Sequence, residues 1–417
     1  MHCVPVPLLF GEDGMATATG REHHWDGLRA FLMLLGIPYH AAMVYDMRTA
    51  WDVQSPVGSE ALTLLSGFLV TFRMPAFFIV AGYFAALTLS RRPPQTWLRG
   101  RVIRLGIPFL TGLALLSPLQ IALVDVADAL RGITSMDGVA ARTAFDVTHP
   151  GMHWIMHLWF LPALLAYSAL LAALWTMMPR TASSLGLRPR LEAWVHRLGS
   201  GLLPLIVFLS IIWALFIDLS HLFLSTLDGP LPYLLAHGVD PYLRYLPFFL
   251  LGVLLRIVPS VAGALVWRAG WALPAAALLS AVIAAALRGR QGLEPVHAAA
   301  DATAAVLMSF LLIGLALRLC RSGDARVDAV VDASFSIYLF HHPAIYGLAS
   351  AFLLVAWPPI IEFLLIAAAS LLLSFGLHRL IRKSSLALFL FNGARPKVAS
   401  GEKPIFTTED RSQGTLR

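Results

Sequence analysis

The chain has 417 residues, of which 58% are hydrophobic and only 13% are charged. Soluble domains carry about 25% charged residues, so this composition excludes a large soluble domain. The net charge of +7 does not indicate nucleic acid as a partner, because the basic residues collect in alternate segments between apolar runs. Cys3 and Cys320 are the two cysteines of the sequence and imply no disulfide framework.

Ten apolar runs predict membrane-spanning helices, and several of them reach the ~20 residues that a bilayer requires. In chain order they cover 28–46, 61–89, 102–124, 157–178, 202–220, 242–257, 269–287, 300–319, 333–356 and 360–381. We therefore expect an all-α, polytopic membrane protein with about ten transmembrane helices in one domain, residues 21–385. Residues 1–20 are expected to be a disordered extension, with Met15 as an alternative start, and residues 386–417 a disordered cytoplasmic tail.

Lysine and arginine residues orient the predicted spans. With the N-terminus inside, 24 of the 31 basic residues fall in inner segments and six in outer segments, while Arg73 lies within a span. Because cytoplasmic loops carry the excess of Lys and Arg, this asymmetry predicts an even number of spans with both termini in the cytoplasm. Many transporters contain an internal repeat, and the predicted spans show none.

Ionisable side chains inside the predicted spans are the main functional signal. His40 lies deep in the first span and Arg73 near the middle of the second, while His341 and its neighbour His342 lie in the ninth. Tyr338 shares a helix face with His341. Such groups give up bulk water at a cost, face the protein interior and usually mark working sites. His40, Arg73, His341 and Tyr338 are therefore candidate catalytic residues. A satisfied core histidine and a structurally paired arginine are the alternative interpretations.

Arginines gather on the predicted cytoplasmic side. Arg101 and Arg104 lie at i and i+3 on one helix face, and Arg91 and Arg92 precede them. Arg29 enters the first span on roughly the same face as the deep histidine, about 16 Å away along the axis. Guanidinium groups bind phosphate bidentately, so these five arginines are candidates for holding the phosphates of a cytoplasmic donor such as coenzyme A. Alternatively, the cluster serves only topology and contact with anionic lipid headgroups.

The predicted outer segment, residues 125–156, is acidic and leads into an aromatic stretch. Carboxylates that accept hydrogen bonds beside aromatic faces suit carbohydrate binding, and a solvated acidic loop with an interfacial aromatic belt is the alternative. His149, His153 and His157 repeat every four residues, as zinc ligands on a helix do. Pro150 and Gly151 are expected to break that helix, so no metal site is predicted.

Several motifs, in chain order, resemble the integral-membrane acyltransferase-3 family. They are 25–29 (WDGLR), 34–40 (LLGIPYH), 72–75 (FRMP), 81–84 (AGYF), 101–104 (RVIR), 106–108 (GIP), 157–161 (HLWFL) and 336–341 (SIYLFH). Within the family, the GIPYH and FRM forms resemble members associated with succinylation of periplasmic glucans. His40, Arg29, Arg101 and Arg104 match the family's functional positions, whereas many members have another residue in place of Arg73.

The resemblance implies an O-acyltransferase of the bacterial inner membrane. Its donor would be cytoplasmic acyl-CoA, succinyl-CoA or acetyl-CoA, acting as a co-substrate, with no tightly bound cofactor. Its acceptor would be a hydroxyl of a periplasmic glucan or another envelope polysaccharide, and a glucan synthase is left open as a further partner. We assign Asp26, His157 and Trp159 as candidate acceptor-binding residues.

In this hypothesis His40 acts as general base, oriented by Tyr338 or His341, and Arg73 stabilises the oxyanion or holds a succinyl carboxylate. An acyl-histidine intermediate stays open. A transporter or flippase for an envelope glycan is the alternative function, because buried Arg and His residues also suit a translocation path.

Overall fold

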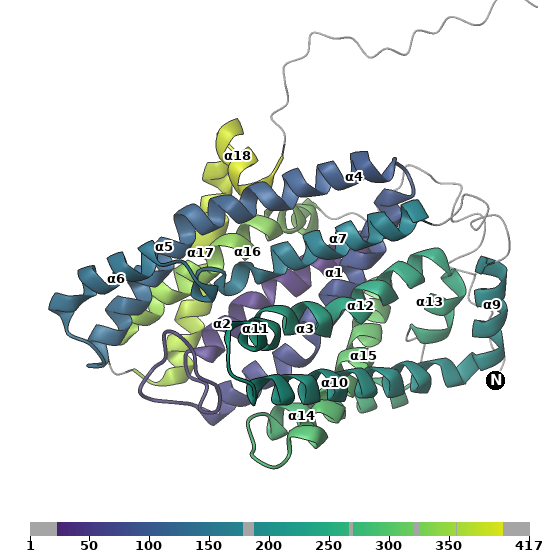
Figure 1. Cartoon of the computed structure of the whole chain (residues 1–417), viewed down its shortest axis with the longest axis horizontal. Helices are drawn as coiled ribbons and strands as arrows, with labels where there is room; N and C mark the ends of the chain where they lie inside the picture. Colours follow the sequence, from purple (N-terminus) through teal and green to yellow (C-terminus); the bar gives the residue numbers. More distant parts are fainter. Residues whose placement is uncertain (1–22, 178–186, 267–269, 321–324, 356, 395–417) are drawn as a thin grey trace, which may run out of the picture.

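The computed structural model describes residues 23–177, 187–266, 270–320, 325–355 and 357–394 (Figure 1). Over these ranges the chain is helical and contains no strand, which confirms the predicted all-α class. The first half forms α1 (His23–Leu34), α2 (Gly36–Met43), α3 (Glu60–Leu89), α4 (Pro94–Arg101), α5 (Ile107–Leu130), α6 (Val139–Thr148) and α7 (Phe160–Met177). The second half forms α9 (Leu187–Leu198), α10 (Leu202–Ser225), α11 (Pro230–Tyr233), α12 (Asp240–Ile257), α13 (Pro259–Leu265), α14 (Ala272–Leu287), α15 (Glu294–Leu319), α16 (Ala325–Phe352), α17 (Pro359–Ile381) and α18 (Ser385–Asn392).

Seven helical segments of the described chain are long and apolar enough to cross a membrane. They are Glu60–Leu89, Pro94–Leu130, Met156–Met177, Pro189–Ser225, Pro230–Ile257, Glu294–Leu319 and Pro359–Ile381. Each of the ten predicted spans overlaps a helix, but α14 has only 16 residues and α16 carries polar side chains in its middle. The count of ten spans and the cytoplasmic placement of both termini stay predictions.

The first predicted span is divided into α1 and α2 at Leu35. Pro38 has no amide hydrogen and cannot donate to the carbonyl of Leu34, so the regular helix is interrupted there. Leu35 and Tyr39 continue the backbone hydrogen bonds on either side of the break. The result is a bent pair of helices that places His40 on α2, in the short element next to the centre of the bundle.

Helix α3 is the central element of the bundle and packs directly on α12. A Cβ atom added at Gly82 would lie 2.0 Å from the carbonyl oxygen of Phe249, and one added at Gly252 would lie 1.9 Å from that of Ile79. The two backbones therefore touch, which only glycine permits and which is typical of helix packing in membranes. This close crossing fixes α3, the helix that carries Arg73, against the rest of the bundle.

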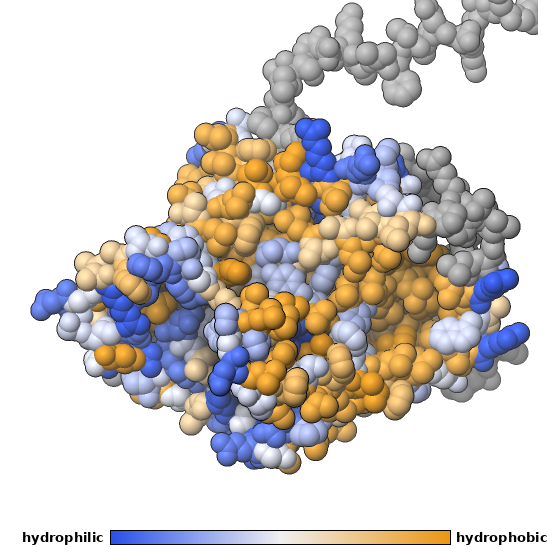
Figure 2. Space-filling model, viewed as in Figure 1, coloured by the Kyte–Doolittle hydropathy of each residue, from blue (hydrophilic) through white to orange (hydrophobic). Residues whose placement is uncertain are grey.

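Large apolar side chains cover the outside of several helices. On α10 these exposed residues are Phe208, Leu209, Ile212, Phe216, Leu219, Leu222 and Phe223, and on α17 they include Leu364, Leu365, Leu371, Leu372 and Leu373. Figure 2 shows a broad hydrophobic surface over the middle of the molecule, with hydrophilic residues gathered toward α6 and toward the lower edge. An apolar surface of this extent is stable against lipid rather than water. The structure therefore has the surface of a multi-pass membrane protein.

The tail predicted to be disordered from residue 386 begins instead with helix α18. Its sequence is apolar, Ser384 accepts a hydrogen bond from the Ala387 amide at 3.3 Å, and Gly393 ends the helix in a left-handed conformation with φ of 63°. Phe391 packs on Phe340 of α16 with ring centroids 5.2 Å apart. The prediction was wrong for this segment because burial of an apolar face stabilises so short a helix. The predicted disorder of residues 1–20 and 395–417 lies outside the described residues.

Candidate active site

A cavity of about 310 Å³ lies among α2, α3, α12, α16 and the segment before α7. We call it the histidine chamber. Its polar lining residues are Tyr39, His40, Asp52, Arg73, His157, Tyr245, Tyr338, His342 and Tyr346, and Trp51 and Trp159 add aromatic walls. Three of the four predicted catalytic residues, His40, Arg73 and Tyr338, therefore line it together with the predicted acceptor residues His157 and Trp159. His341 does not line the cavity, but its ring lies against that of His40. These residues come from helices that are far apart in the sequence, so the chamber depends on the tertiary packing of the bundle.

His40 lies at the centre of an aromatic cluster. Its side chain is only 8% exposed, and its ring stacks on Trp51 with centroids 5.2 Å apart. The rings of His342 and His341 lie 4.8 Å and 5.3 Å from it. Within the described chain, Nδ1 of His40 is buried and has no hydrogen-bond partner. Because an unpartnered buried polar atom is costly, this nitrogen is a natural contact for a substrate group.

The other three histidines are held by oxygen acceptors, which assigns their tautomers. His341 donates from Nδ1 to the Tyr338 carbonyl at 2.7 Å, and His157 donates from Nε2 to the Leu339 carbonyl at 3.2 Å. Their remaining nitrogens, His341 Nε2 and His157 Nδ1, are buried without a partner in the described residues. In its neutral form each ring presents a lone pair at that nitrogen, as a proton acceptor must.

His342 is fixed in the same way by a side chain. Its Nδ1 donates to Gln120 Oε1 at 2.6 Å, while the Gln120 amide nitrogen donates to the Leu116 carbonyl at 3.2 Å. That second bond sets the orientation of the amide group, so the oxygen is the atom that faces the imidazole. His342 also stacks on His157 with centroids 4.4 Å apart. A polar glutamine in the middle of α5 thus acts as the orienting residue of this ring.

Arg73 brings a positive charge to the chamber. Its guanidinium lies over the ring of Tyr39, 4.5 Å from the centroid, and its Nε is buried without a hydrogen-bond partner in the described part of the chain. A cation–π contact stabilises the charge but leaves its donors available. The side chain can therefore bind an anionic group that enters the chamber.

One predicted role is wrong. Tyr338 was expected to orient His40, but its hydroxyl donates to the backbone carbonyl of His157 at 2.7 Å. That bond occupies the hydroxyl proton, so Tyr338 fixes the segment before α7 rather than the base. His341 contacts His40 through its ring, and its Nδ1 is directed at the Tyr338 carbonyl. Of the neighbouring histidine rings, that of His342 lies nearer to His40 than that of His341.

The chamber also contains residues that sequence reasoning did not assign. Trp51 and Asp52 lie in the loop of residues 44–59, and the Asp52 carboxylate accepts a hydrogen bond from the Tyr346 hydroxyl. Tyr245 enters from α12. His342 could have been found from its place beside His341, because both are ionisable groups in one predicted span. The loop residues carry no periodic signal.

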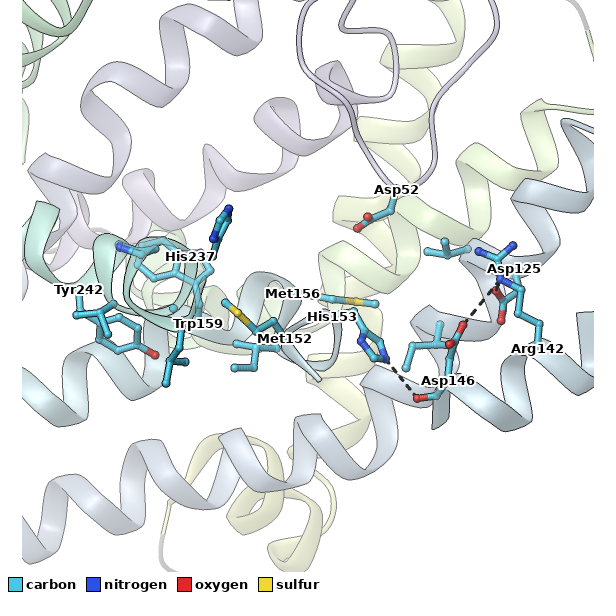
Figure 3. A pocket seen from close by; sticks show the side chains of 17 residues that line it. Asp52, Asp125, Arg142, Asp146, Met152, His153, Met156, Trp159, His237 and Tyr242 are labelled. Atoms are coloured by element: carbon cyan, nitrogen blue, oxygen red, sulfur yellow. Dashed lines mark hydrogen bonds and ion pairs between the residues drawn. The ribbon is translucent and has the colours of Figure 1, made fainter. Parts of the chain in front are cut away.

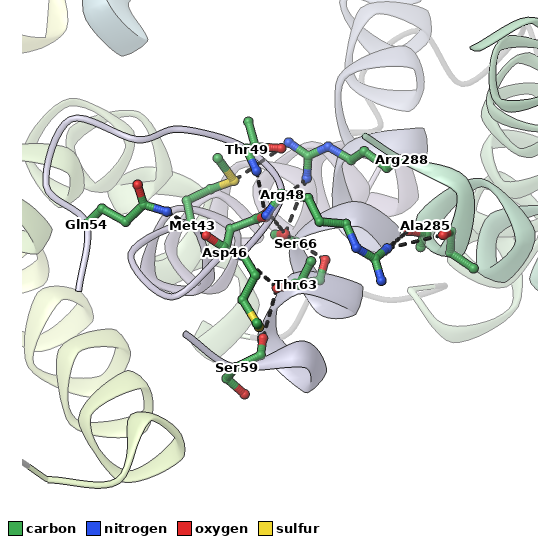
Figure 4. Close-up of polar contacts among 12 residues, drawn as sticks. Met43, Asp46, Arg48, Thr49, Gln54, Ser59, Thr63, Ser66, Ala285 and Arg288 are labelled. Carbon is green, nitrogen blue, oxygen red and sulfur yellow. Dashed lines mark hydrogen bonds and ion pairs between the residues drawn. The ribbon is translucent and has the colours of Figure 1, made fainter. Parts of the chain in front are cut away.

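The loop of residues 44–59 is anchored by a buried carboxylate. Asp46 accepts hydrogen bonds from the amides of Arg48 and Thr49, at 2.8 Å and 3.0 Å, and from the Ser66 hydroxyl at 2.6 Å. Arg288, at the end of α14, lies 3.3 Å from the same carboxylate. Figure 4 shows these contacts converging on Asp46 from the loop, from α3 and from the end of α14. The network holds the loop that carries Trp51 against the bundle.

The predicted arginine cluster forms at one end of α5. The Arg101 Nε donates to the Ser168 hydroxyl at 3.2 Å, and its guanidinium lies over the ring of Trp97. Arg29 and Arg104 are close enough to Arg101 to interact electrostatically. Arg104 lies in the π turn Val102–Gly106, a feature that often marks a functional site.

The remaining predicted residues of this end lie outside the chamber. Arg91 and Arg92 are exposed. Asp26 lies 3.3 Å from Arg29 and does not line the chamber, so the structure places it at the arginine cluster rather than beside His40. Burial lowers the pKa of His24 to about 4, so arginines rather than this histidine supply the positive charge here.

A second cavity, of about 900 Å³, adjoins the chamber (Figure 3). We call it the acidic vestibule. It shares Asp52, Met156 and Trp159 with the histidine chamber. One side is formed by Asp125, Arg142 and Asp146 and the other by Trp159, His237 and Tyr242. The vestibule includes Asp125, near the C-terminal end of α5. The arginine cluster lies at the N-terminal end of the same helix, which is about 36 Å long. His149, His153 and His157, which repeat every four residues in the sequence, do not form a metal site. In the described residues no cluster of three or more His, Cys, Asp or Glu side chains could hold a metal ion.

Comparison with known proteins gives one consistent result. A sequence model described as an acyltransferase domain (Acyl_transf_3) matches residues 22–379. Glucans biosynthesis protein C of Salmonella gallinarum (strain 287/91 / NCTC 13346) is 30% identical over 336 residues, which cover 78% of this chain and 82% of the relative. The proteins of the same name from Shigella dysenteriae serotype 1 and Escherichia coli (strain K12 / DH10B) are each 31% identical, with the same coverage. No solved structure matches.

Proposed function

The chain belongs to the acyltransferase-3 family, and we propose that it is an O-acyltransferase that moves a succinyl or acetyl group from acyl-CoA to a hydroxyl of a periplasmic glucan. Family membership and the seven apolar helices make it a multi-pass membrane acyltransferase. The donor, the direction of transfer and the inner membrane belong to the proposal. A glucan synthase that supplies the acceptor is left open as a further partner.

The observation that carries the proposal is the place of the histidine chamber between two different sites. At one end of α5 the arginine cluster offers guanidinium donors that suit the phosphates of coenzyme A. At the other end the acidic vestibule adjoins the chamber, with which it shares Asp52, Met156 and Trp159. The donor would enter at the arginine end, from one side of the membrane, and the acceptor at the vestibule, from the other side. The two would meet at the histidines.

His40 is the proposed general base. It would take the proton from the acceptor hydroxyl as the oxygen attacks the thioester carbon, so that a C–O bond forms and the C–S bond breaks. The proton then passes to the coenzyme A thiolate, which leaves as the thiol. His342 lies edge-on to His40, and Gln120 accepts its Nδ1 hydrogen, which leaves the lone pair on Nε2. This pair can therefore orient the base and share the proton. General-base catalysis of this kind contributes about 10²–10⁴-fold to the rate.

Arg73 has two roles that fit its position. No carboxylate of the described residues pairs with its guanidinium, which lines the chamber beside Tyr39. With any acyl donor the guanidinium would stabilise the oxyanion that develops on the thioester carbonyl. With a succinyl donor it would instead hold the distal carboxylate, and a bidentate contact of that kind favours succinyl over acetyl.

The proposal is tested by mass spectrometry of periplasmic glycans from cells with and without the gene, complemented by the wild-type protein or by His40→Ala. A mass increment of a succinyl or acetyl group that depends on the wild-type protein is expected, and it names the donor. Unchanged acylation in cells without the gene, with glycan that accumulates on the wrong side of the membrane, would instead establish transport and overturn acyl transfer.

A further inference from the structure

The acidic vestibule is about three times as large as the chamber that it adjoins, about 900 Å³ against about 310 Å³. A site that needed to admit only one hydroxyl group would not require this space. Its walls also differ in chemistry, because ion-paired carboxylates face aromatic side chains across the cavity (Figure 3). We propose that the vestibule is an extended binding site for a neutral oligosaccharide, which it holds over several sugar units so that one hydroxyl enters the histidine chamber. This inference rests on the proposed function.

The polar wall is built to present oxygen atoms. Arg142 Nε lies 3.0 Å from Asp125 and 3.8 Å from Asp146, and the Thr143 hydroxyl donates to Asp125 at 2.6 Å. Asp125 is buried and fixed by these contacts, whereas the Arg142 and Asp146 side chains are 40% and 33% exposed. The exposed oxygens of Asp146 therefore retain lone pairs for ligand hydroxyls, and Arg142 retains donors.

The charge of the vestibule selects the kind of ligand. The lining contains the carboxylates of Asp52, Asp125 and Asp146 and the guanidinium of Arg142, so carboxylates outnumber guanidinium groups. Phosphate or carboxylate ligands would meet net repulsion there, and a neutral ligand rich in hydroxyls would not. The opposite wall supplies Trp159 and Tyr242, whose rings offer apolar faces with a polar edge. Sugar rings carry both an apolar C–H face and hydroxyl groups, so an unsubstituted stretch of glucan fits both walls.

The junction between the two cavities is held in an unusual backbone conformation. Met156 lines both cavities and has φ of 41°, a left-handed value that is strained for a residue with a side chain. The surrounding bonds support it, since the Trp154 indole donates to the Asp146 carbonyl at 3.0 Å and the Ser117 hydroxyl donates to the Trp154 carbonyl at 2.7 Å. Such strain is typical of sites where the chain must pass a ligand closely.

If the vestibule binds several sugar units, kcat/KM should depend on the length of the acceptor. With purified protein and acyl-CoA, coenzyme A release is measured against glucose, a glucan disaccharide and longer glucan oligosaccharides. We expect kcat/KM to rise at least tenfold from glucose to the longer acceptors, because each added unit gains contacts with the vestibule. Equal kcat/KM for all lengths would overturn the inference while leaving acyl transfer established.

The matched variants are Asp146→Asn and Asp228→Asn. Asp146 binds His153 and Trp154 through its backbone carbonyl, so the substitution leaves these bonds in place. It changes the carboxylate that faces the cavity beside Arg142. Asp228 is exposed and does not line the vestibule. We expect Asp146→Asn to lower the ratio of kcat/KM for a long acceptor to that for glucose about tenfold, which corresponds to one lost charged hydrogen bond. Asp228→Asn should leave that ratio unchanged, and a similar effect of both variants would contradict the assignment.

A binding measurement separates failure of the inference from failure of the proposed function. Calorimetry without donor should detect a long glucan oligosaccharide binding to the wild-type protein, with weaker binding to Asp146→Asn. Binding without any coenzyme A release would support the vestibule and remove the acyl-transfer proposal. Absence of binding by the wild-type protein would overturn the vestibule, whatever the outcome of the activity assay.

Discussion

Arg73 and His341 approach the same point above the backbone of Gly36. A Cβ atom added at this glycine would lie 3.1 Å from Arg73 Nη1 and 3.1 Å from His341 Nε2. The guanidinium is a donor and this imidazole nitrogen carries a lone pair, so two groups of opposite hydrogen-bonding character share the space that residue 36 leaves open. The backbone of Gly36 is helical, so its conformation does not require glycine. The close approach of the two side chains does.

The first prediction is that Gly36→Ala lowers kcat about tenfold, because small misplacements of catalytic groups are costly. A contact of 3.1 Å is too short for a methyl carbon, so the Arg73 and His341 side chains must shift. The fold should survive, since alanine favours a helix over glycine by about 1 kcal/mol. Coenzyme A release and thermal unfolding of the purified protein check both parts. The control is Gly376→Ala in α17, where an added Cβ meets no atom within 4 Å. An unchanged kcat for Gly36→Ala would show that the chamber tolerates the shift.

The second prediction is that His40→Ala lowers kcat by about 10²–10⁴-fold, the usual contribution of a general base. The variant should be expressed at the wild-type level and keep its affinity for acyl-CoA, because the arginine cluster is distant from α2. His196→Ala provides the control, since His196 is an exposed histidine on α9. Wild-type turnover of His40→Ala would remove the general-base assignment, and acyl label trapped on His40 would indicate a covalent intermediate instead.

The third prediction concerns Gln120, the residue that fixes His342. Gln120→Leu leaves the Nδ1 hydrogen of His342 without its acceptor, which costs about 1–3 kcal/mol for a buried group. We expect kcat to fall at least fivefold with little change in the KM of either substrate, together with an altered pH dependence of kcat. Gln120→Glu keeps an oxygen acceptor and should recover part of kcat. Equal loss in both variants would point to a packing role for this residue.

Much of the chamber follows from the sequence by one physical rule. Ionisable groups such as His40, Arg73 and His341 are expensive in a membrane helix, so their presence there marks a working interior. The all-α class follows as directly from the apolar runs. Both arguments depend on single residues or single segments, and therefore need no knowledge of how the helices pack.

The parts that could not be predicted depend on packing between distant segments. Trp51 and Asp52 lie in a loop whose position is set by the buried Asp46 network, and nothing in the loop sequence indicates that contact. Tyr338 was given the wrong partner because its helix face is predictable while the carbonyl opposite it is not. Helix α18 was missed because eight apolar residues are too short for a span, and only the surface of α5 and α16 makes them helical.

The fourth prediction is that Arg101→Ala raises the KM for acyl-CoA about tenfold or more, as expected for a lost hydrogen bond to a charged group. Arg101→Lys should recover only part of this affinity, because an ammonium group cannot form the bidentate contact. The maximal rate at saturating donor should change little, since Arg101 lies away from the chamber. Arg197→Ala, an exposed arginine on α9, is the control. Unchanged donor affinity would leave the cluster with only a topological and lipid-binding role.

The fifth prediction tests the anchor of the loop over His40. Arg288→Met removes the cation beside Asp46, whose side chain is fully buried (Figure 4). The carboxylate keeps its bonds from Thr49 and Ser66, so we expect a loss of about 1–3 kcal/mol rather than the ~3–5 kcal/mol of a completely broken buried pair. A lower melting temperature in detergent is the direct measurement, and Arg290→Met, at an exposed arginine, is the control.

The anchor also links stability to catalysis. The loop places Trp51 against the imidazole of His40, so loosening it should lower kcat in parallel with the melting temperature. In a double-mutant cycle with Asp46→Asn, the two substitutions should be strongly non-additive, because they act on one network. Additive losses, or a lower melting temperature with wild-type kcat, would mean that Arg288 stabilises the end of α14 without holding the loop over the chamber.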